Sequence, residues 1–150
     1  MRVHEFESEL WLPLPPVEIF PFFSDAGNLD VITPKWLHFR VVTPQPVEMR
    51  AGALMDYRLR VHGLPMRWRT LVKEWQPPYR FADEQLRGPY RQWLHVHTFE
   101  SHHGGTLTRD VVHYAVPLNC IVHPLFVRHD IENIFEFRRK SLRNIFGADP

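Results

Sequence analysis

QWLHVHTFE, residues 92–100, shows the alternation from which the fold of this chain can be predicted. If the stretch is a β-strand, Trp93, His95, His97 and Phe99 share one face, because side chains alternate between the two faces of a strand. Two histidines on an otherwise aromatic face are compatible with three uses. They could be metal ligands, acid–base groups or the polar lining of a ligand pocket.

The next strand pairs with this one through the turn HHGG at residues 102–105. In that register His97 lies opposite Asp110, and Trp93 lies opposite Tyr114. A carboxylate opposite His97 is expected to orient its ring and to raise its pKa. Asp110 is also the third ligand in the metal interpretation of the two histidines.

The same alternation predicts further strands before and after this stretch. Turns rich in Gly and Pro separate most of them, which is typical of an antiparallel meander. The expected strands cover residues 3–12, 37–43, 53–61, 66–75, 80–86, 90–100 and 106–116.

The register of two turns decides which side chains face inward. A turn at residues 62–65 places Tyr57 opposite Thr70, with Trp68 on the same face. The turn RGP near residue 88 is expected to be irregular, because a bulge there lets Phe81, Asp83 and Gln85 face inward. Glu84 then faces outward, in an ordinary salt bridge with Arg67, Arg69, Arg80 or Arg109.

Helical periodicity appears in three places. A short helix is expected at residues 15–23, and a second one, capped by Ser24 or Asp25, carries Leu29 and Ile32. A long amphipathic helix is expected at residues 124–146. Its apolar stripe consists of Val127, Ile131, Ile134, Phe135, Leu142 and Ile145, whereas Arg128, Arg138, Arg139 and Arg143 are expected beside or opposite the stripe, in solvent.

Composition limits the class of protein. The 150 residues are 44% hydrophobic and fit one domain, residues 1–150. Lys and Arg number 18 against 17 Asp and Glu, so no overall charge attracts nucleic acid. The single cysteine, Cys120, cannot form an intrachain disulfide and is expected to be an inert packing residue. No stretch approaches the roughly 18 apolar residues of a membrane span, so we expect a cytoplasmic protein. We expect it to be a monomer or a homodimer.

This order of elements resembles the helix-grip fold of the START domains and birch-pollen-allergen proteins, the SRPBCC superfamily. The amino-acid sequence of residues 32–41, 63–90, 93–100 and 104–117 is similar to that of its bacterial polyketide cyclase/dehydrase-like branch. The resemblance implies an α+β fold in which a curved antiparallel sheet of about seven strands wraps around the long C-terminal helix. It also implies a hydrophobic cavity between the sheet and that helix.

We therefore predict a protein that binds a hydrophobic small molecule, such as a lipid, a polyketide or an isoprenoid-like compound. Two alternatives remain open. The protein is a cyclase, aromatase or dehydrase with His97 and Asp110 as its catalytic pair, or it is a regulatory interaction module without an enzymatic role. No cofactor or metal is assigned. The predicted ligand-binding residues are Tyr57, Trp68, Phe81, Asp83, Gln85, Trp93, His95, His97, Phe99, Asp110, Tyr114, Ile131 and Phe135.

Overall fold

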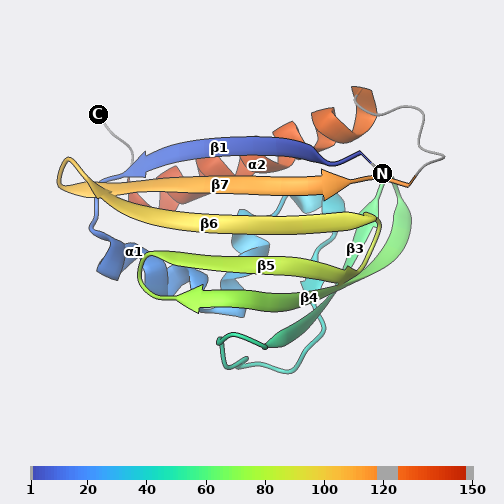
Figure 1. Cartoon of the computed structure of the whole chain (residues 1–150), viewed down its shortest axis with the longest axis horizontal. Coiled ribbons are helices and arrows are strands. Elements are labelled where there is room, and N and C mark those ends of the chain that lie inside the picture. The colour runs from blue at the N-terminus through green and yellow to red at the C-terminus, as the bar shows by residue number, and fades with distance from the viewer. Residues whose placement is uncertain (1, 118–124, 148–150) are drawn as a thin grey trace.

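The computed structural model describes residues 2–117 and 125–147. One antiparallel sheet of seven strands has the order β1-β7-β6-β5-β4-β3-β2 (Figure 1). The first strand therefore lies at one edge of the sheet and pairs with the last strand. The strands are β1 (His4–Leu12), β2 (Arg40–Val41), β3 (Leu54–Val61), β4 (Leu64–Gln76), β5 (Arg80–Arg87), β6 (Gln92–His102) and β7 (Gly105–Ala115).

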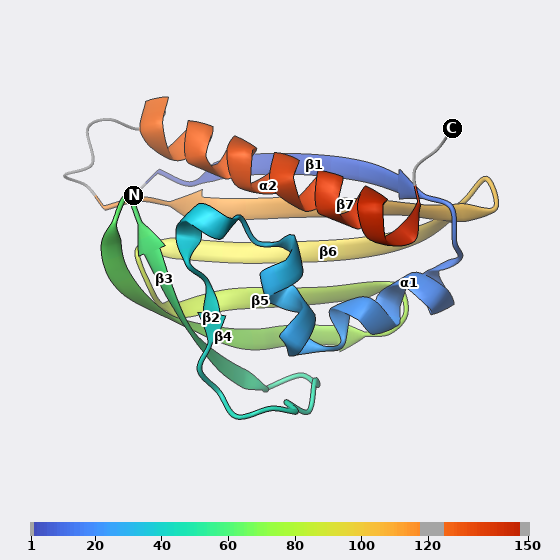
Figure 2. The same ribbon diagram turned by 180° about the vertical axis from the view of Figure 1, so that it is seen from behind.

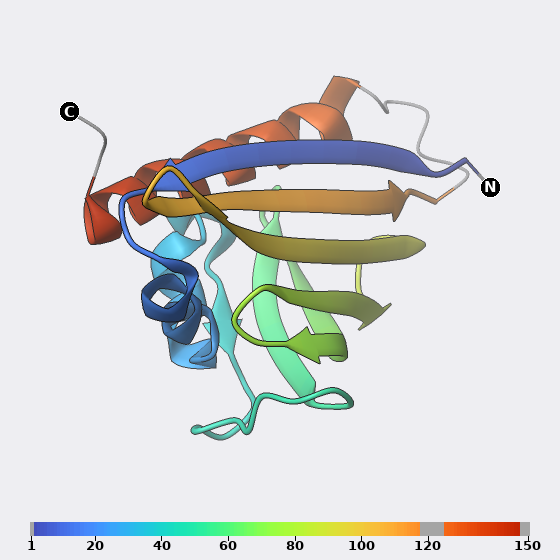
Figure 3. The same cartoon turned by 60° about the vertical axis from the view of Figure 1, so that its left-hand side comes forward.

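All the described helices lie on one face of the sheet. They are α1 (Pro16–Phe23), the 3-10 helices η1 (Ala26–Ile32) and η2 (Lys35–Leu37), and α2 (Leu125–Phe146). Figure 2 shows α2 running along the β1, β7 and β6 side of this face, with η1 and α1 beside it. Figure 3 shows the sheet bending toward β3, so that it curves around the helices. The predicted helix-grip architecture is therefore confirmed.

Alternation along the strands places the core between the concave face and the helices. In β1 the glutamates face outward, whereas Phe6, Ser8, Leu10 and Leu12 are buried, as predicted. Near one end of the sheet, Phe20 and Phe23 of α1 pack against the buried side chains of β5 and β6. No described helix is both long and apolar enough to cross a membrane.

Both predicted hairpins form, with tighter turns than expected. The β3–β4 turn contains only His62 and Gly63, with φ of 50° and 80°. A two-residue hairpin turn whose twist matches that of the strands requires such positive φ angles at both residues. Tyr57 consequently pairs with Trp68 and not with Thr70. Because the shift is two residues, every side chain keeps its predicted face.

The β6–β7 turn likewise contains two residues, and the predicted pairs form. His97 lies opposite Asp110 and Trp93 lies opposite Tyr114. The irregular connection near Gly88 also leaves Asp83 on the same face as His95, its partner in β6. These three strands together position the candidate site.

Three other expectations were wrong. Residues 37–43 do not form a full strand, because His38 has a left-handed φ of 47° after η2 and only Arg40–Val41 pair with β3. Ile145 is 41% exposed, and Phe146 packs against the core in its place. Arg138, which was expected in solvent, is only 11% exposed. Cys120 is outside the described residues, as is the first residue predicted for the long helix.

Candidate functional site

A cluster of charged and polar side chains lies on the concave face, where β5, β6 and β7 run side by side. Asp83 comes from β5, His95 and His97 from β6, and Asp110 from β7. His95, His97 and Asp110 are buried, while the Asp83 side chain keeps 21% of its surface exposed. Cross-strand pairing brings these residues together, as their predicted common face requires.

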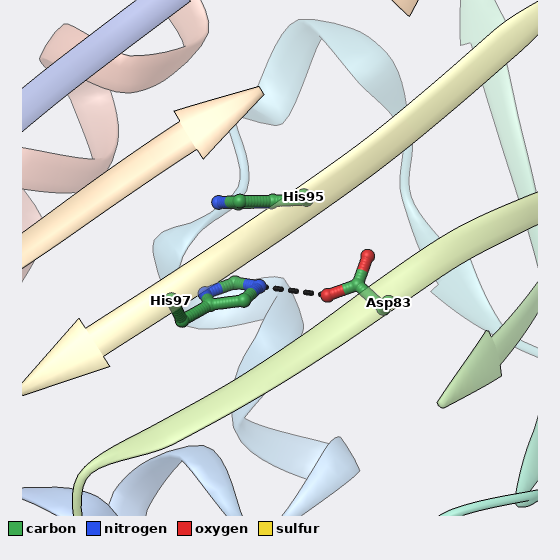
Figure 4. Close-up of side chains that lie close together, drawn as sticks. All are labelled: Asp83, His95 and His97. Atoms are coloured by element: carbon green, nitrogen blue, oxygen red, sulfur yellow. Dashed lines mark hydrogen bonds and ion pairs between the residues drawn. The ribbon is translucent and has the colours of Figure 1, made fainter. Parts of the chain in front are cut away.

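Each histidine has a carboxylate partner. His95 Nε2 lies 2.8 Å from Asp110 Oδ1, and His97 Nε2 lies 2.7 Å from Asp83 Oδ2 (Figure 4). Because an ionised carboxylate only accepts hydrogen bonds, both Nε2 atoms are the donors. His97 Nδ1 also lies 3.3 Å from Asp110 Oδ1. The predicted His97–Asp110 pair therefore exists, but the shortest hydrogen bond of His97 is made to Asp83.

The histidine rings form part of an aromatic stack. The His95 and His97 centroids are 3.6 Å apart, with 24° between the ring planes. On the other side of His97, Phe81 stacks at 3.9 Å and 12°. This packing holds the His97 ring on two sides and leaves only its edges for polar contacts.

Arg138 of α2, which was predicted to lie in solvent, adds a cation to the cluster. Its Nη2 lies 3.4 Å from Asp110 Oδ1 and 3.3 Å from His97 Nδ1. The side chain is only 11% exposed, and its guanidinium lies over the ring of Phe23. Its Nε is buried and makes no hydrogen bond to the described residues.

The signal for Arg138 was present in the sequence. Ile131, Phe135 and Leu142 are buried, and position 138 lies in the middle of their stripe, since spacings of four and seven residues return to the same face of a helix. Arg138 was nevertheless predicted to be solvated, because a charged side chain is usually exposed even when its position falls within an apolar stripe. The ion pair with the buried Asp110 allows it to be buried.

The environment moves the two histidine pKa values in opposite directions. Burial, followed by the charge of His97, lowers the pKa of His95 to about 4. Burial also acts to lower the pKa of His97, but its hydrogen bonds with Asp110 and Asp83 outweigh burial, and the net shift is upward. The structure thus favours a neutral His95 beside a protonated His97.

Both carboxylates of the cluster stay ionised. Burial alone would raise the pKa of Asp110, but Arg138 and the two histidines hold it well below its ordinary value. For Asp83 the hydrogen bond from His97 likewise outweighs burial and lowers the pKa. The cluster therefore contains two anions, which are balanced by Arg138 and, below the raised pKa of His97, by the protonated His97 ring.

Two acceptor atoms of the cluster receive no hydrogen bond from the described residues. Asp83 Oδ1 accepts no hydrogen bond from them, since only Oδ2 is bonded to His97. His95 Nδ1 carries a lone pair, because Nε2 holds the proton of the neutral ring, and it too is unbonded. A ligand with hydroxyl donors would suit both atoms.

A metal ion is the other species that such atoms attract. Ligand atoms of Asp83, His95 and His97 lie within 4.8 Å of one another. However, in-plane lone pairs on stacked rings run roughly side by side and do not converge on one ion. Arg138 also places a positive charge 3.3 Å from His97. These residues can approach a metal only after the stack has opened.

Aromatic side chains extend the concave face beyond the cluster. Trp68 and Trp93 meet edge to face with centroids 5.3 Å apart, and Tyr90 lies 4.7 Å from Trp93. Trp93 and Tyr114 are buried, whereas Trp68 and Tyr90 are half-buried. Tyr90 was missed, because alternation along the expected strand 90–100 placed it on the face opposite Trp93, whereas β6 begins only at Gln92 and Tyr90 lies in the β5–β6 connection.

The remaining predicted ligand-binding residues divide into two groups. Tyr57 is half-buried on the concave face, and burial raises its pKa, so the phenol stays neutral. Ile131 and Phe135 of α2 are buried, and Phe135 lies 5.4 Å from the His95 ring. These three remain candidates for contact with a ligand.

Gln85 and Phe99 have other surroundings. The Gln85 amide donates to the Tyr90 carbonyl at 2.7 Å and accepts from its N–H, which closes the β5–β6 connection. Phe99 packs against Phe20 and Phe23 of α1, within the apolar core. Glu84 forms an outward ion pair as expected, but its partner, at 3.1 Å, is Lys73 and not one of the expected arginines.

Comparison with protein families gives a match over most of the chain. The family described as "Polyketide cyclase / dehydrase and lipid transport" matches residues 12–134. The chain belongs to this family. No curated protein matches the sequence.

Solved structures share the fold at low sequence identity. The di-domain ARO/CYC StfQ from the steffimycin biosynthetic pathway superposes with a TM-score of 0.76 at 11% identity, over 96% of this chain and 50% of that one. Protein CV1439 from Chromobacterium violaceum gives 0.75 at 15% identity, over 97% and 99%. Ara h 8.0201 gives 0.69 at 16% identity, over 99% and 100%. These likenesses show the fold, and function depends on the side chains described above.

Proposed function

We propose that this polyketide cyclase/dehydrase and lipid-transport family member binds a hydrophobic small molecule that carries a hydroxyl group. Its site lies between the concave face of the sheet and α2. The observation that carries the proposal is the free pair of acceptors, Asp83 Oδ1 and His95 Nδ1, beside aromatic side chains. Acceptors select ligands that donate, such as a phenol, an enol or an alcohol.

Apolar contacts supply the affinity in this proposal. Trp68, Tyr90 and Tyr57 are half-buried on the concave face and offer rings to an apolar ligand. Tyr57 remains a neutral phenol, so it can donate to a carbonyl of the same molecule. A polyketide, with alternating carbonyl and enol groups on an apolar chain, combines both features.

Binding is favoured over turnover by the chemistry of the same residues. Both ring nitrogens of His97 lie within 3.3 Å of a neighbouring polar group, so His97 has no free nitrogen with which to remove a proton. Asp83 has a free oxygen, but its lowered pKa makes it a weak base. The catalytic pair His97 and Asp110 therefore becomes a positioning pair in this proposal.

A proton-abstracting enzyme of the cyclase or dehydrase type is the second candidate, and the partly exposed Asp83 favours it. Asp83 would then be the base, with His97 holding it in place. Deuterium exchange at the acidic CH₂ of a 1,3-diketone, followed by NMR, tests this role. Enzyme-dependent exchange that disappears in Asp83→Asn would put turnover ahead of binding.

The binding proposal is tested first by native mass spectrometry of the purified protein and then by tryptophan fluorescence. The probes are 2-naphthol and 2-methylnaphthalene, which differ in the hydroxyl group. We expect 2-naphthol to bind about tenfold more tightly, since a hydrogen bond to a charged group contributes roughly 1.5–3 kcal/mol. Asp83→Asn should remove most of this preference and leave the affinity for 2-methylnaphthalene unchanged.

His113→Ala is the matched control. His113 is a half-exposed histidine three residues after Asp110 in β7, and it occupies the outer face. It should bind both probes as the wild type does, whereas His95→Ala should lose the hydroxyl preference. Equal affinity of the wild type for the two probes would contradict the proposed role of the acceptors.

A further inference from the structure

Arginines gather on the outer face of the sheet at its β2–β5 end. Arg40, Arg58 and Arg67 lie directly opposite one another across β2, β3 and β4. One row along, Arg69 lies opposite Arg87 of β5. All five are exposed, and we call them the arginine patch.

The patch contains little opposite charge. Asp56 pairs with Arg69 at 2.8 Å, and the positive charges around it lower its pKa. Among the described residues, Arg40, Arg58, Arg67 and Arg87 make no ion pair. Like charges directly opposite each other weaken a sheet, so this arrangement costs stability that the fold alone does not require.

The surface is local, because the other end of the same face carries the opposite charge. Outward positions of β1 are Glu5, Glu7 and Glu9, and Arg109 of β7 pairs with the latter two. The near-zero net charge of the chain therefore hides two oppositely charged ends. The β2–β5 end attracts polyanions although the whole protein does not.

Aliphatic side chains accompany the arginines. Val42, beside β2, is 45% exposed, and Leu54 of β3 is 49% exposed. By alternation Val42 and Leu54 share the outer face with the arginines. Basic residues combined with exposed aliphatic tips suit a surface that offers anionic headgroups above an apolar layer.

We propose that the arginine patch docks the protein on the surface of membranes that contain anionic lipids. A nucleic-acid partner fits less well, because the outward positions of β3, β4 and β5 in this patch carry no aromatic ring for base stacking. The ribbon of this face is also convex (Figures 1 and 3). Docking is peripheral and requires no membrane-spanning helix.

Vesicle co-sedimentation tests this inference with the full chain. The vesicles consist of phosphatidylcholine with or without phosphatidylserine, at low and at high salt. We expect binding only to the phosphatidylserine vesicles, and loss of binding at high salt, because salt screens exposed charges. Arg58→Glu/Arg67→Glu should bind at least about tenfold more weakly, as each basic residue near an anionic surface contributes about 1 kcal/mol.

Lys140→Glu/Arg143→Glu is the matched control. Both residues are exposed on α2, so this variant has the same net charge change on the opposite side of the molecule. It should bind as the wild type does. The single variant Arg67→Glu guards against unfolding, because it places a glutamate opposite Arg58 and is expected to fold at least as stably as the wild type.

The possible outcomes separate the partners. Salt-sensitive binding to phosphatidylserine vesicles that depends on Arg58 and Arg67 supports the inference. Absence of such binding at low salt, or equal loss in the α2 control, overturns it. Binding of a fluorescent RNA or DNA oligonucleotide through the same arginines, without vesicle binding, would also overturn the membrane assignment. The hydroxyl-ligand proposal stands or falls independently of these results.

Discussion

The rings of His95 and His97 stack with centroids 3.6 Å apart, yet their pKa values move in opposite directions. His95 has one carboxylate partner at hydrogen-bond distance, whereas His97 lies between two. A protonated His97 also repels a second proton on His95. The neighbours on β5 and β7 therefore divide the charge within the pair.

The first prediction concerns stability against pH. The contribution of His97, whose pKa is raised, is fully present below its ordinary value of 6.5 and is lost as pH rises through its folded pKa. The pKa of His95 is lowered from 6.5 to about 4 in the folded protein. Between these pH values His95 is therefore protonated in the unfolded chain but not in the folded one. Stability should then fall by on the order of 3 kcal/mol between these values.

The two effects together give a stability maximum near pH 6.5, which urea unfolding at a series of pH values measures. Below the ordinary carboxyl pKa of 3.8, stability falls further as Asp83 and Asp110 are protonated through their lowered pKa values. His95→Phe should flatten the loss between pH 6.5 and 4. A variant that keeps the full acid loss would show that other groups cause it.

The second prediction concerns Arg138. Arg138→Met keeps an unbranched apolar stem in the stripe of α2 but removes the arginine charge beside Asp110. Because a buried charge loses its partner, the free energy of unfolding should fall by about 3 kcal/mol. Arg143→Met, at an exposed position of the same helix, should change it little. Similar effects of the two substitutions in denaturant would mean that Arg138 is effectively solvated.

The third prediction concerns the charge of Asp83. Asp83→Asn preserves the shape but removes one of the two carboxylates that raise the pKa of His97, so this pKa should fall. NMR titration of the histidine ring carbons measures the change. Asp56→Asn removes a carboxylate paired with Arg69 on the outer face of β3 and should leave the His97 titration in place. An unchanged His97 pKa in Asp83→Asn would assign the shift to Asp110.

The fourth prediction concerns the β6–β7 turn. A Cβ on Gly105 would collide with the carbonyl oxygen of Leu12 and with the indole of Trp11, and the backbone atom cannot rotate away. Gly105→Ala should destabilise the protein by roughly 1–3 kcal/mol, the usual cost of overpacking. Gly104→Asn is the control, because position 104 has φ +74° and open space, which Asn tolerates. Thermal unfolding of the two variants compares them.

Alternation along the chain was enough to predict most of the concave face. A period of two residues identifies the side chains that share a face, and this parity survives a register error of two, as the β3–β4 hairpin demonstrates. The partners His97 and Asp110 were found because the β6–β7 register was right. The prediction of a strand at 37–43 was wrong, because the pattern of apolar and polar side chains does not reveal the left-handed backbone conformation of His38.

By itself the sequence determined the fold class, the faces of the strands and the group of residues that forms the site. Only the tertiary structure decided that His97 bonds most closely to Asp83, that Arg138 completes the cluster, and that arginines from four strands form one surface. The reason is that local periodicity reports how a side chain leaves its own backbone. Charge pairing depends on distances between separate elements, which packing alone sets.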